Sequence, residues 1–195
     1  MARPRLHDDA LRTRLLEVAS RVISSDGEAS VTVRKVAAEA GTSASAVYAL
    51  FGSREALVEA VSDEGFRRFA QELASAGSGA DPVEDLRALG RAYRRFALAD
   101  PHYYRVMFHR GVAPTGADPA RAVEQPTFRV LHDAVAHVLD GAPDERVVTA
   151  AVGLWGLVHG LVSLELAGLL PGDEATRAEA FAQAGATVAE ALLTG

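Results

Sequence analysis

The sequence predicts an all-α protein, and three observations lead to that prediction. Valine and isoleucine recur at helical spacing, and no stretch alternates cleanly between apolar and polar residues over six positions. Alternation indicates a half-buried strand, whereas an apolar repeat of three to four residues indicates an amphipathic helix. Hydrophobic residues make up 49% of the 195 residues and charged residues 24%, which is typical of a soluble globular chain.

Capping and stop residues delimit the first four predicted helices. Asp26-Gly27 ends the first helix, and Thr32 caps a short second one that Gly41 ends. A third helix starts near Ser43, and Ser53 caps the long fourth one. The expected ranges are 8–25, 33–40, 43–51 and 53–75.

Proline and glycine delimit five further helices. A Gly/Ser-rich linker over 76–82 lacks an apolar anchor, and Pro82 and Pro101 each suit the first turn of a helix. A second loop is expected over 111–119. The helix after it is either continuous or broken near Gln125-Pro126. The expected ranges are 82–99, 101–110, 120–139, 144–169 and 173–193.

Composition argues against an enzyme or a metal protein. The absence of cysteine excludes a disulfide scaffold, a zinc ribbon and a thiol nucleophile. The six histidines form no metal-binding helix motif, and neither a phosphate-binding glycine loop nor a serine-nucleophile elbow is present. We therefore expect no catalysis, no metal and no cofactor. The N-terminus has no apolar run of signal-peptide length, so a cytoplasmic location is expected.

Charge divides the chain into two modules. Residues 1–54 hold eight basic and six acidic side chains, a net charge of +2, whereas the remainder carries −8. A mildly basic head on an acidic body predicts different partners for the two parts. We place the head at 1–54 and the body at 55–195.

The head contains the pattern of a helix-turn-helix. Two short helices are joined at Gly41, and Val36 and Val47 are placed to face the core. Small residues at the start of the second short helix would let it seat deeply in a major groove. A plain helical corner, with Tyr48 and Phe51 in its core, is the alternative reading of the spacing alone.

A longer set of residues in this segment makes the assignment more specific. It consists of Thr32, Val36-Ala37, Ala40-Gly41-Thr42-Ser43, Val47-Tyr48 and Phe51-Gly52-Ser53-Arg54-Glu55-Ala56-Leu57. Over about the first 60 residues this set resembles the DNA-binding head of the TetR/AcrR family of transcriptional regulators. The resemblance implies a three-helix head on a six-helix body that binds a ligand and forms a dimer. Most such proteins are repressors that a small molecule releases.

Two positions depart from the family pattern. Leu50 stands where the family often has a phosphate-contacting histidine, and Arg54 replaces a common lysine. The recognition helix also lacks side chains that pair bidentately with bases, so we expect readout by shape, by Arg34 and by an N-terminal arm in the minor groove. The predicted DNA contacts are Arg3, Arg5, Thr32, Arg34, Lys35, Ser43, Ala44, Ser45, Ala46, Tyr48, Ala49 and Arg54.

The body contains an uncharged run over 147–164 that is 18 residues long. Such a run is either a short membrane span or a helix buried on all sides. Recurring small residues favour burial between two chains, so we expect a homodimer and no membrane. The expected interface consists of Gly153, Gly156, Gly160, Leu164, Phe181, Gly185, Val188 and Leu192. The motif Trp155…His159-Gly160 resembles a C-terminal signature of one family subclass.

Aromatic residues with a few polar neighbours gather in the body. They are either ordinary core or the lining of a pocket for a hydrophobic or amphipathic effector. The candidate lining consists of Phe66, Phe69, Tyr93, Phe96, Tyr104, Met107, Phe108, His109, Phe128, Trp155 and His159. The sequence thus predicts a repressor that binds an inverted-repeat operator and is released by a small molecule. A helix-turn-helix regulator controlled by protein partners alone is the alternative.

Overall fold

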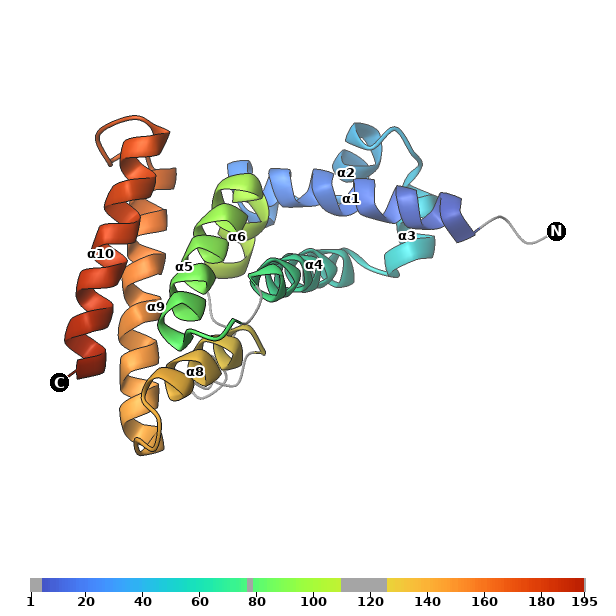
Figure 1. Ribbon diagram of the computed structural model, residues 1–195. Helices are drawn as coiled ribbons and strands as arrows, with labels where there is room; N and C mark the ends of the chain where they lie inside the picture. The colour runs from blue at the N-terminus through green and yellow to red at the C-terminus, as the bar shows by residue number, and fades with distance from the viewer. Residues whose placement is uncertain (1–4, 77–78, 110–125, 195) are drawn as a thin grey trace. The chain divides into compact units, whose positions relative to one another are not determined.

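The computed structural model describes residues 5–76, 79–109 and 126–194 (Figure 1). Within these ranges the chain folds into nine α-helices and one short 3-10 helix, and contains no strand. The all-α prediction is therefore confirmed. The predicted loop 111–119 and residues 120–125 lie outside the described residues.

The first helices begin and end where the capping residues indicated. Side-chain oxygens of Thr32, Ser43 and Ser53 accept hydrogen bonds from backbone N–H groups three residues later, at 3.1, 3.2 and 3.0 Å. Gly41 has a φ of +67°, which an L side chain rarely adopts, and it makes the turn between the two short helices. The elements are α1 (Arg5–Asp26), η1 (Glu28–Ser30), α2 (Val33–Glu39), α3 (Ala44–Phe51) and α4 (Arg54–Ser75).

The later helices differ from prediction mainly at their ends. The helix predicted over 144–169 stops at Leu166, because Gly168 turns left-handed at φ +69°. The Leu169 N–H then donates to the Leu164 carbonyl at 3.0 Å, which closes the helix end. These helices are α5 (Pro82–Ala99), α6 (Pro101–His109), α8 (Pro126–Val138), α9 (Asp144–Leu166) and α10 (Glu174–Thr194).

The chain forms two compact units that share α4. The first contains the residues up to Arg68 together with α6 from Asp100 onward, and the second contains Phe69–Ala99 and the helices from α8 onward. Residues 69–75 of α4 thus belong to the second unit. The predicted division into a DNA-binding domain over 1–54 and a ligand-binding and dimerisation domain over 55–195 stays a prediction.

The core of the first unit is built on α1, which packs against α2, α3 and α6. Leu15, Val36, Val47 and Leu57 are fully buried there, each from a different helix. Val36 and Val47 anchor the two short helices by one face each. Their opposite faces are thereby left for solvent or a partner.

The second unit is built on α9, which packs against α5, α8 and α10 and runs antiparallel to α10 (Figure 1). An ion triad joins three of these helices. The Arg94 guanidinium donates to both carboxylate oxygens of Glu165 at 2.6 and 2.8 Å, and Arg177 Nε donates to the same carboxylate at 3.1 Å. These hydrogen bonds, that from Arg94 foremost, lower the pKa of Glu165, whose side chain is only 6% exposed. The triad therefore keeps a buried carboxylate ionised and satisfied.

Removal of a fully buried side chain tests the packing of α4 on the head. Leu57→Ala leaves a cavity under α4 and should lower the free energy of unfolding by about 2–5 kcal/mol. Val83→Ala, at a position 39% exposed, is the control and should change it by less than about 0.5 kcal/mol. Denaturant unfolding measures both, and equal effects would contradict the packing described.

Candidate nucleic-acid interface and effector region

One face of the α2–α3 pair carries small or polar side chains, many of which are exposed. Tyr48 has 54% of its surface exposed, although it lies next to the fully buried Val47. The predicted contacts divide into an exposed group and a half-buried group. The exposed group is Thr32, Arg34, Ser43, Ser45, Tyr48 and Ala49, and the half-buried group is Lys35, Ala44, Ala46 and Arg54.

The two basic side chains of α2 have different surroundings. Lys35 Nζ lies 2.6 Å from Asp26 Oδ2 at the end of α1, and this hydrogen bond lowers the pKa of the Asp26 carboxyl. Arg34 is exposed and, among the described residues, makes no ion pair or side-chain hydrogen bond. An unpaired guanidinium is therefore available on this face for a base or a phosphate.

The start of α3 is held by two serines. Ser43 Oγ accepts from the Ala46 N–H at 3.2 Å and lies 2.9 Å from Ser45 Oγ. The pair orders the N-terminal turn of α3, where small side chains leave the helix accessible. Arg5 begins α1 but its side chain lies outside the described residues, as does all of Arg3, so the predicted arm is not described.

Arg54 has a partner that the sequence did not indicate. Its Nε donates to the Val31 carbonyl at 2.8 Å, and its Nη2 donates to the Glu28 carbonyl at 2.6 Å. Hydrogen bonds to backbone carbonyls do not depend on the type of the accepting residue. The sequence contained one signal, which is that arginine replaces the lysine common in the family at this position.

Six of the candidate lining residues form one continuous chain of contacts in the second unit. Phe69 packs on Phe96 and Tyr93, with ring centroids 5.0 and 5.2 Å apart. The Tyr93 hydroxyl and His159 Nδ1 are hydrogen-bonded at 3.0 Å. Trp155 continues the chain from His159 to Phe128, at centroid distances of 6.4 and 5.9 Å. The chain is apolar at both ends and carries one polar pair at its middle.

The other candidate lining residues lie in the first unit. Phe108 contacts Phe66 and Tyr104, with centroid distances of 6.3 and 5.0 Å. Met107 lies on Gly65, where a Cβ atom would come within 2.8 Å of its thioether. The side chain of His109 lies outside the described residues. The candidate set thus has members in both units.

The predicted interface residues lie on α9 and α10. Gly153 and Gly156 are exposed, Leu164 is 42% exposed, and a Cβ atom at Gly156 would meet no atom of the described residues within 4 Å. Gly153 also adjoins Leu192 of α10, which would lie 2.9 Å from an added Cβ atom. Four members are half-buried, namely Gly160, Gly185, Val188 and Leu192, and Phe181 is buried within its own chain.

α9 is long and apolar enough to cross a membrane by length and composition, and only 28% of its apolar window is buried. Within the described ranges, no group of three histidine or acidic side chains is arranged to hold a metal ion.

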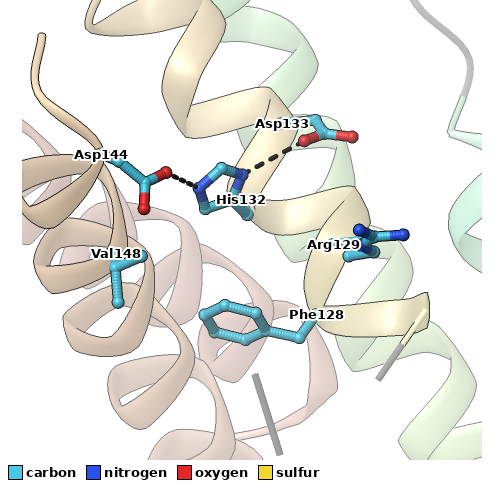
Figure 2. A pocket seen from close by; sticks show the side chains of 6 residues that line it. All are labelled: Phe128, Arg129, His132, Asp133, Asp144 and Val148. Atoms are coloured by element: carbon cyan, nitrogen blue, oxygen red, sulfur yellow. Dashed lines mark hydrogen bonds and ion pairs between the residues drawn. The ribbon is translucent and has the colours of Figure 1, made fainter. Parts of the chain in front are cut away.

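An open pocket of about 370 Å³ lies between α8 and the start of α9 (Figure 2). Only Phe128 is shared with the predicted lining. His132 stands between two carboxylates, with Nε2 at 3.0 Å from Asp144 and Nδ1 at 3.2 Å from Asp133. The hydrogen bond to Asp133, followed by that to Asp144, raises the pKa of His132. The histidine thereby joins α8 to the first turn of α9.

His132→Asn tests this link through its pH dependence. Because the pKa of His132 is raised in the folded state, its stabilising effect is fully present below its ordinary value of 6.5 and is lost as the pH rises through the raised value. Wild type should exceed the variant in free energy of unfolding by up to about 1 kcal/mol at low pH, as for a surface ion pair. The gap should close at alkaline pH, as followed by urea unfolding.

The control for this measurement is His137→Asn, which removes an exposed histidine from the same helix without breaking a described ion pair. If the free energies of unfolding of wild type and His132→Asn differ by the same amount at every pH, the ion pairs of His132 do not stabilise the fold.

Models of known protein families match both the N-terminal and the C-terminal part of the chain. The family described as bacterial regulatory proteins of the tetR family matches residues 15–61, and the tetracyclin repressor-like C-terminal domain matches residues 86–188. An HTH-type transcriptional regulator of Mycobacterium tuberculosis is 26% identical over 202 residues, covering 86% of each chain. An uncharacterised HTH-type regulator of Xanthobacter autotrophicus is 28% identical over 153 residues, covering 76% of each.

Solved structures of similar proteins have the same fold. A regulatory protein superimposes with a TM-score of 0.72 at 27% identity, covering 96% of this chain and 98% of the other. A TetR family transcription regulator from Marinobacter aquaeolei gives a TM-score of 0.73 at 24% identity, covering 94% and 97%, and supports the fold. Members of the family are transcriptional regulators and not enzymes. The chain belongs to the TetR family of DNA-binding, HTH-type transcriptional regulators.

Proposed function

We propose that this protein is a cytoplasmic, homodimeric repressor that binds an inverted-repeat operator and is released by a hydrophobic or amphipathic small molecule. The observation that carries the proposal is the exposed surface of α2 and α3, which includes Tyr48 and Arg34, an arginine without an ion pair among the described residues. The family relationship supplies the DNA-binding class. The operator form, the effector and the sign of regulation are our inferences.

Readout on this face relies on few side chains. The Tyr48 hydroxyl and the capped start of α3 suit phosphate oxygens, which fix register without reading sequence. Arg34 is the one exposed arginine of α2, and a guanidinium pairs bidentately with guanine. Ala49 offers at most a contact with a thymine methyl group. Sequence preference therefore comes from Arg34 and from DNA shape.

The exposed apolar surface of α9 supports dimerisation. Residues 147–164 carry no charge, yet Val152 and Leu164 remain 45% and 42% exposed. Gly156 and Gly160 leave open space above the helix, which permits close approach of a second one. A second copy of the chain covers this surface. The resulting twofold arrangement presents two heads to half-sites about 34–36 Å apart, or a multiple of that spacing.

Effector control uses α4 and α6. Arg68 of α4 binds Glu64 at 2.8 Å and approaches Glu17 of α1 and Asp100 before α6 at 3.7 and 3.5 Å. Its guanidinium also lies 4.4 Å from the ring centre of Tyr103 in α6. Through these contacts of Arg68, a displacement of α6 is transmitted to α1 and α4. A hundredfold loss of DNA affinity requires about 2.7 kcal/mol of difference in effector affinity between the two states.

The aromatic chain of the second unit favours an apolar effector. Phe96, Phe69 and Trp155 provide apolar contact area, and the hydrogen-bonded pair of Tyr93 and His159 provides one polar position. Such a combination suits a hydrophobic body with a single hydrogen-bonding group.

Selection of bound duplexes from a random library, at two salt concentrations, tests the proposed function. An enriched inverted repeat is the expected result, and its half-site spacing gives the separation of the heads. Weak, strongly salt-dependent retention without a motif would reduce the DNA affinity to a nonspecific one and would refute the operator proposal.

Arg34→Ala should relax the preference at one base pair in each half-site, costing about 1–3 kcal/mol there. The same selection, run on the variant, measures this change. Tyr48→Phe is the matched comparison, because loss of a phosphate contact should weaken all sequences about equally. A sequence preference that Arg34→Ala leaves intact would remove the assigned role of Arg34.

Gly156→Leu should separate the two chains without unfolding either. The added side chain meets open space within its own chain, and leucine has a higher helix propensity than glycine. Analytical ultracentrifugation should then show a species with the mass of one chain, 20.5 kDa. Circular dichroism is the control for folding, and a folded variant that stays dimeric would place the interface elsewhere.

A further inference from the structure

We propose that Arg54 is a positioning residue that closes the helix-turn-helix segment against the start of α4, and that it does not act as a phosphate contact. This inference rests on the proposed function, because the segment that Arg54 closes is the proposed DNA-reading part.

The two bonds of Arg54 join the ends of that segment. Arg54 is the first residue of α4, while its acceptors, the carbonyls of Val31 and Glu28, precede α2. Residues 32–53 between these points include both short helices. The guanidinium therefore joins the two ends of this segment and closes it into a loop.

We call the two hydrogen bonds of Arg54 the clamp. The carbonyls that accept them lie just before α2 and determine where that helix begins. Val31 is fully buried, and the next residue, Thr32, caps α2 through its side chain. Fixing the Val31 carbonyl fixes the first turn of α2, which carries Arg34. The donor, Arg54, is also held in place because it begins α4. The Ser53 side chain caps that helix by accepting a hydrogen bond from the Ala56 N–H. A movement of α4 is thus transmitted to the reading helices through Arg54.

The remaining edge of the guanidinium is poorly suited to a phosphate. Its Nη1 lies 3.5 Å from Glu55 Oε1, and the Arg54 side chain is only 31% exposed. The carboxylate of Glu55 already occupies the vicinity of the free edge and would repel an approaching phosphate.

Lysine cannot reproduce this arrangement. A guanidinium holds its donors in a rigid fork that reaches two carbonyls at once, whereas an ammonium is a single point charge on a flexible stem. Lysine does keep the positive charge that a phosphate contact needs. Arg54→Lys therefore separates the two roles, and Arg54→Ala removes both.

The experiment compares wild type, Arg54→Lys and Arg54→Ala as full chains. Hydrogen exchange of the free proteins reports on α2, and binding to the selected operator and to a scrambled duplex is measured over a range of salt concentrations. We expect faster exchange over 33–39 in both variants. We also expect operator affinity to fall about tenfold or more in both, as for loss of hydrogen bonds to a charged group. The salt dependence should stay that of wild type.

Arg87→Ala is the matched control. It removes one exposed arginine from α5, where Arg87 pairs with Glu84 of its own helix. This variant should leave exchange over 33–39 and the ratio of operator to scrambled binding unchanged. Thermal unfolding of each variant monitors the global fold, and Arg54→Lys keeps the aliphatic stem if Arg54→Ala is too unstable to measure.

The opposite pattern would overturn the inference. A phosphate contact predicts that Arg54→Lys binds as wild type does, while Arg54→Ala loses about 0.9 from the slope of log affinity against log salt concentration. Wild-type exchange in both variants would equally refute the clamp. If the wild-type protein selects no operator, the proposed function fails, and exchange in the free protein still decides whether the clamp exists.

Discussion

A helix with a long uncharged run, which its own chain covers only in part, lies at the centre of the second unit. α9 carries eighteen consecutive uncharged residues and packs on α5, α8 and α10, but only 28% of its apolar window is buried. Exposed apolar surface of this extent is unfavourable in water. In our account the cost is removed by a second copy of the chain. In the proposed function, pairing through α9 sets the distance between two reading heads, and this distance has to match the half-site spacing of the operator.

α4 contributes residues to both units. It is one continuous helix whose residues up to Arg68 belong to the first unit and whose remainder belongs to the second. Arg54 binds the segment before α2 at one end of this stretch, and Arg68 contacts α1 and the start of α6 at the other. Two arginines thus connect α4 to the parts that the proposed mechanism moves, by polar contacts that a small shift can break and re-form.

Local signals made the head predictable from the sequence. Thr32 and Ser53 cap helices, and Gly41 makes a left-handed turn, because these roles depend on one or two neighbouring residues. The partners of Arg54 were not predictable, since a backbone carbonyl has no residue type. His132 was missed for a related reason, because its link to Asp144 depends on how α8 and α9 pack.

For the proposed effector lining, the sequence shows which residues are aromatic but not how they are arranged. Phe66 and Phe69 stand three residues apart on α4, so helical spacing places them on one face, yet they belong to different units. Phe181 was assigned to the interface by its spacing on α10, whereas the structure buries it within its own chain. Spacing identifies the apolar face of a helix. It does not identify which neighbour covers that face.

The mass of the complex with the selected duplex tests whether pairing through α9 brings two chains to the DNA. Sedimentation of the protein on an inverted repeat and on a duplex with a single half-site would measure how many chains each duplex binds. We expect two chains on the inverted repeat and a large loss of affinity on the single half-site. One chain bound with equal affinity to either duplex would contradict this expectation, because the heads would then act without the pairing that α9 imposes.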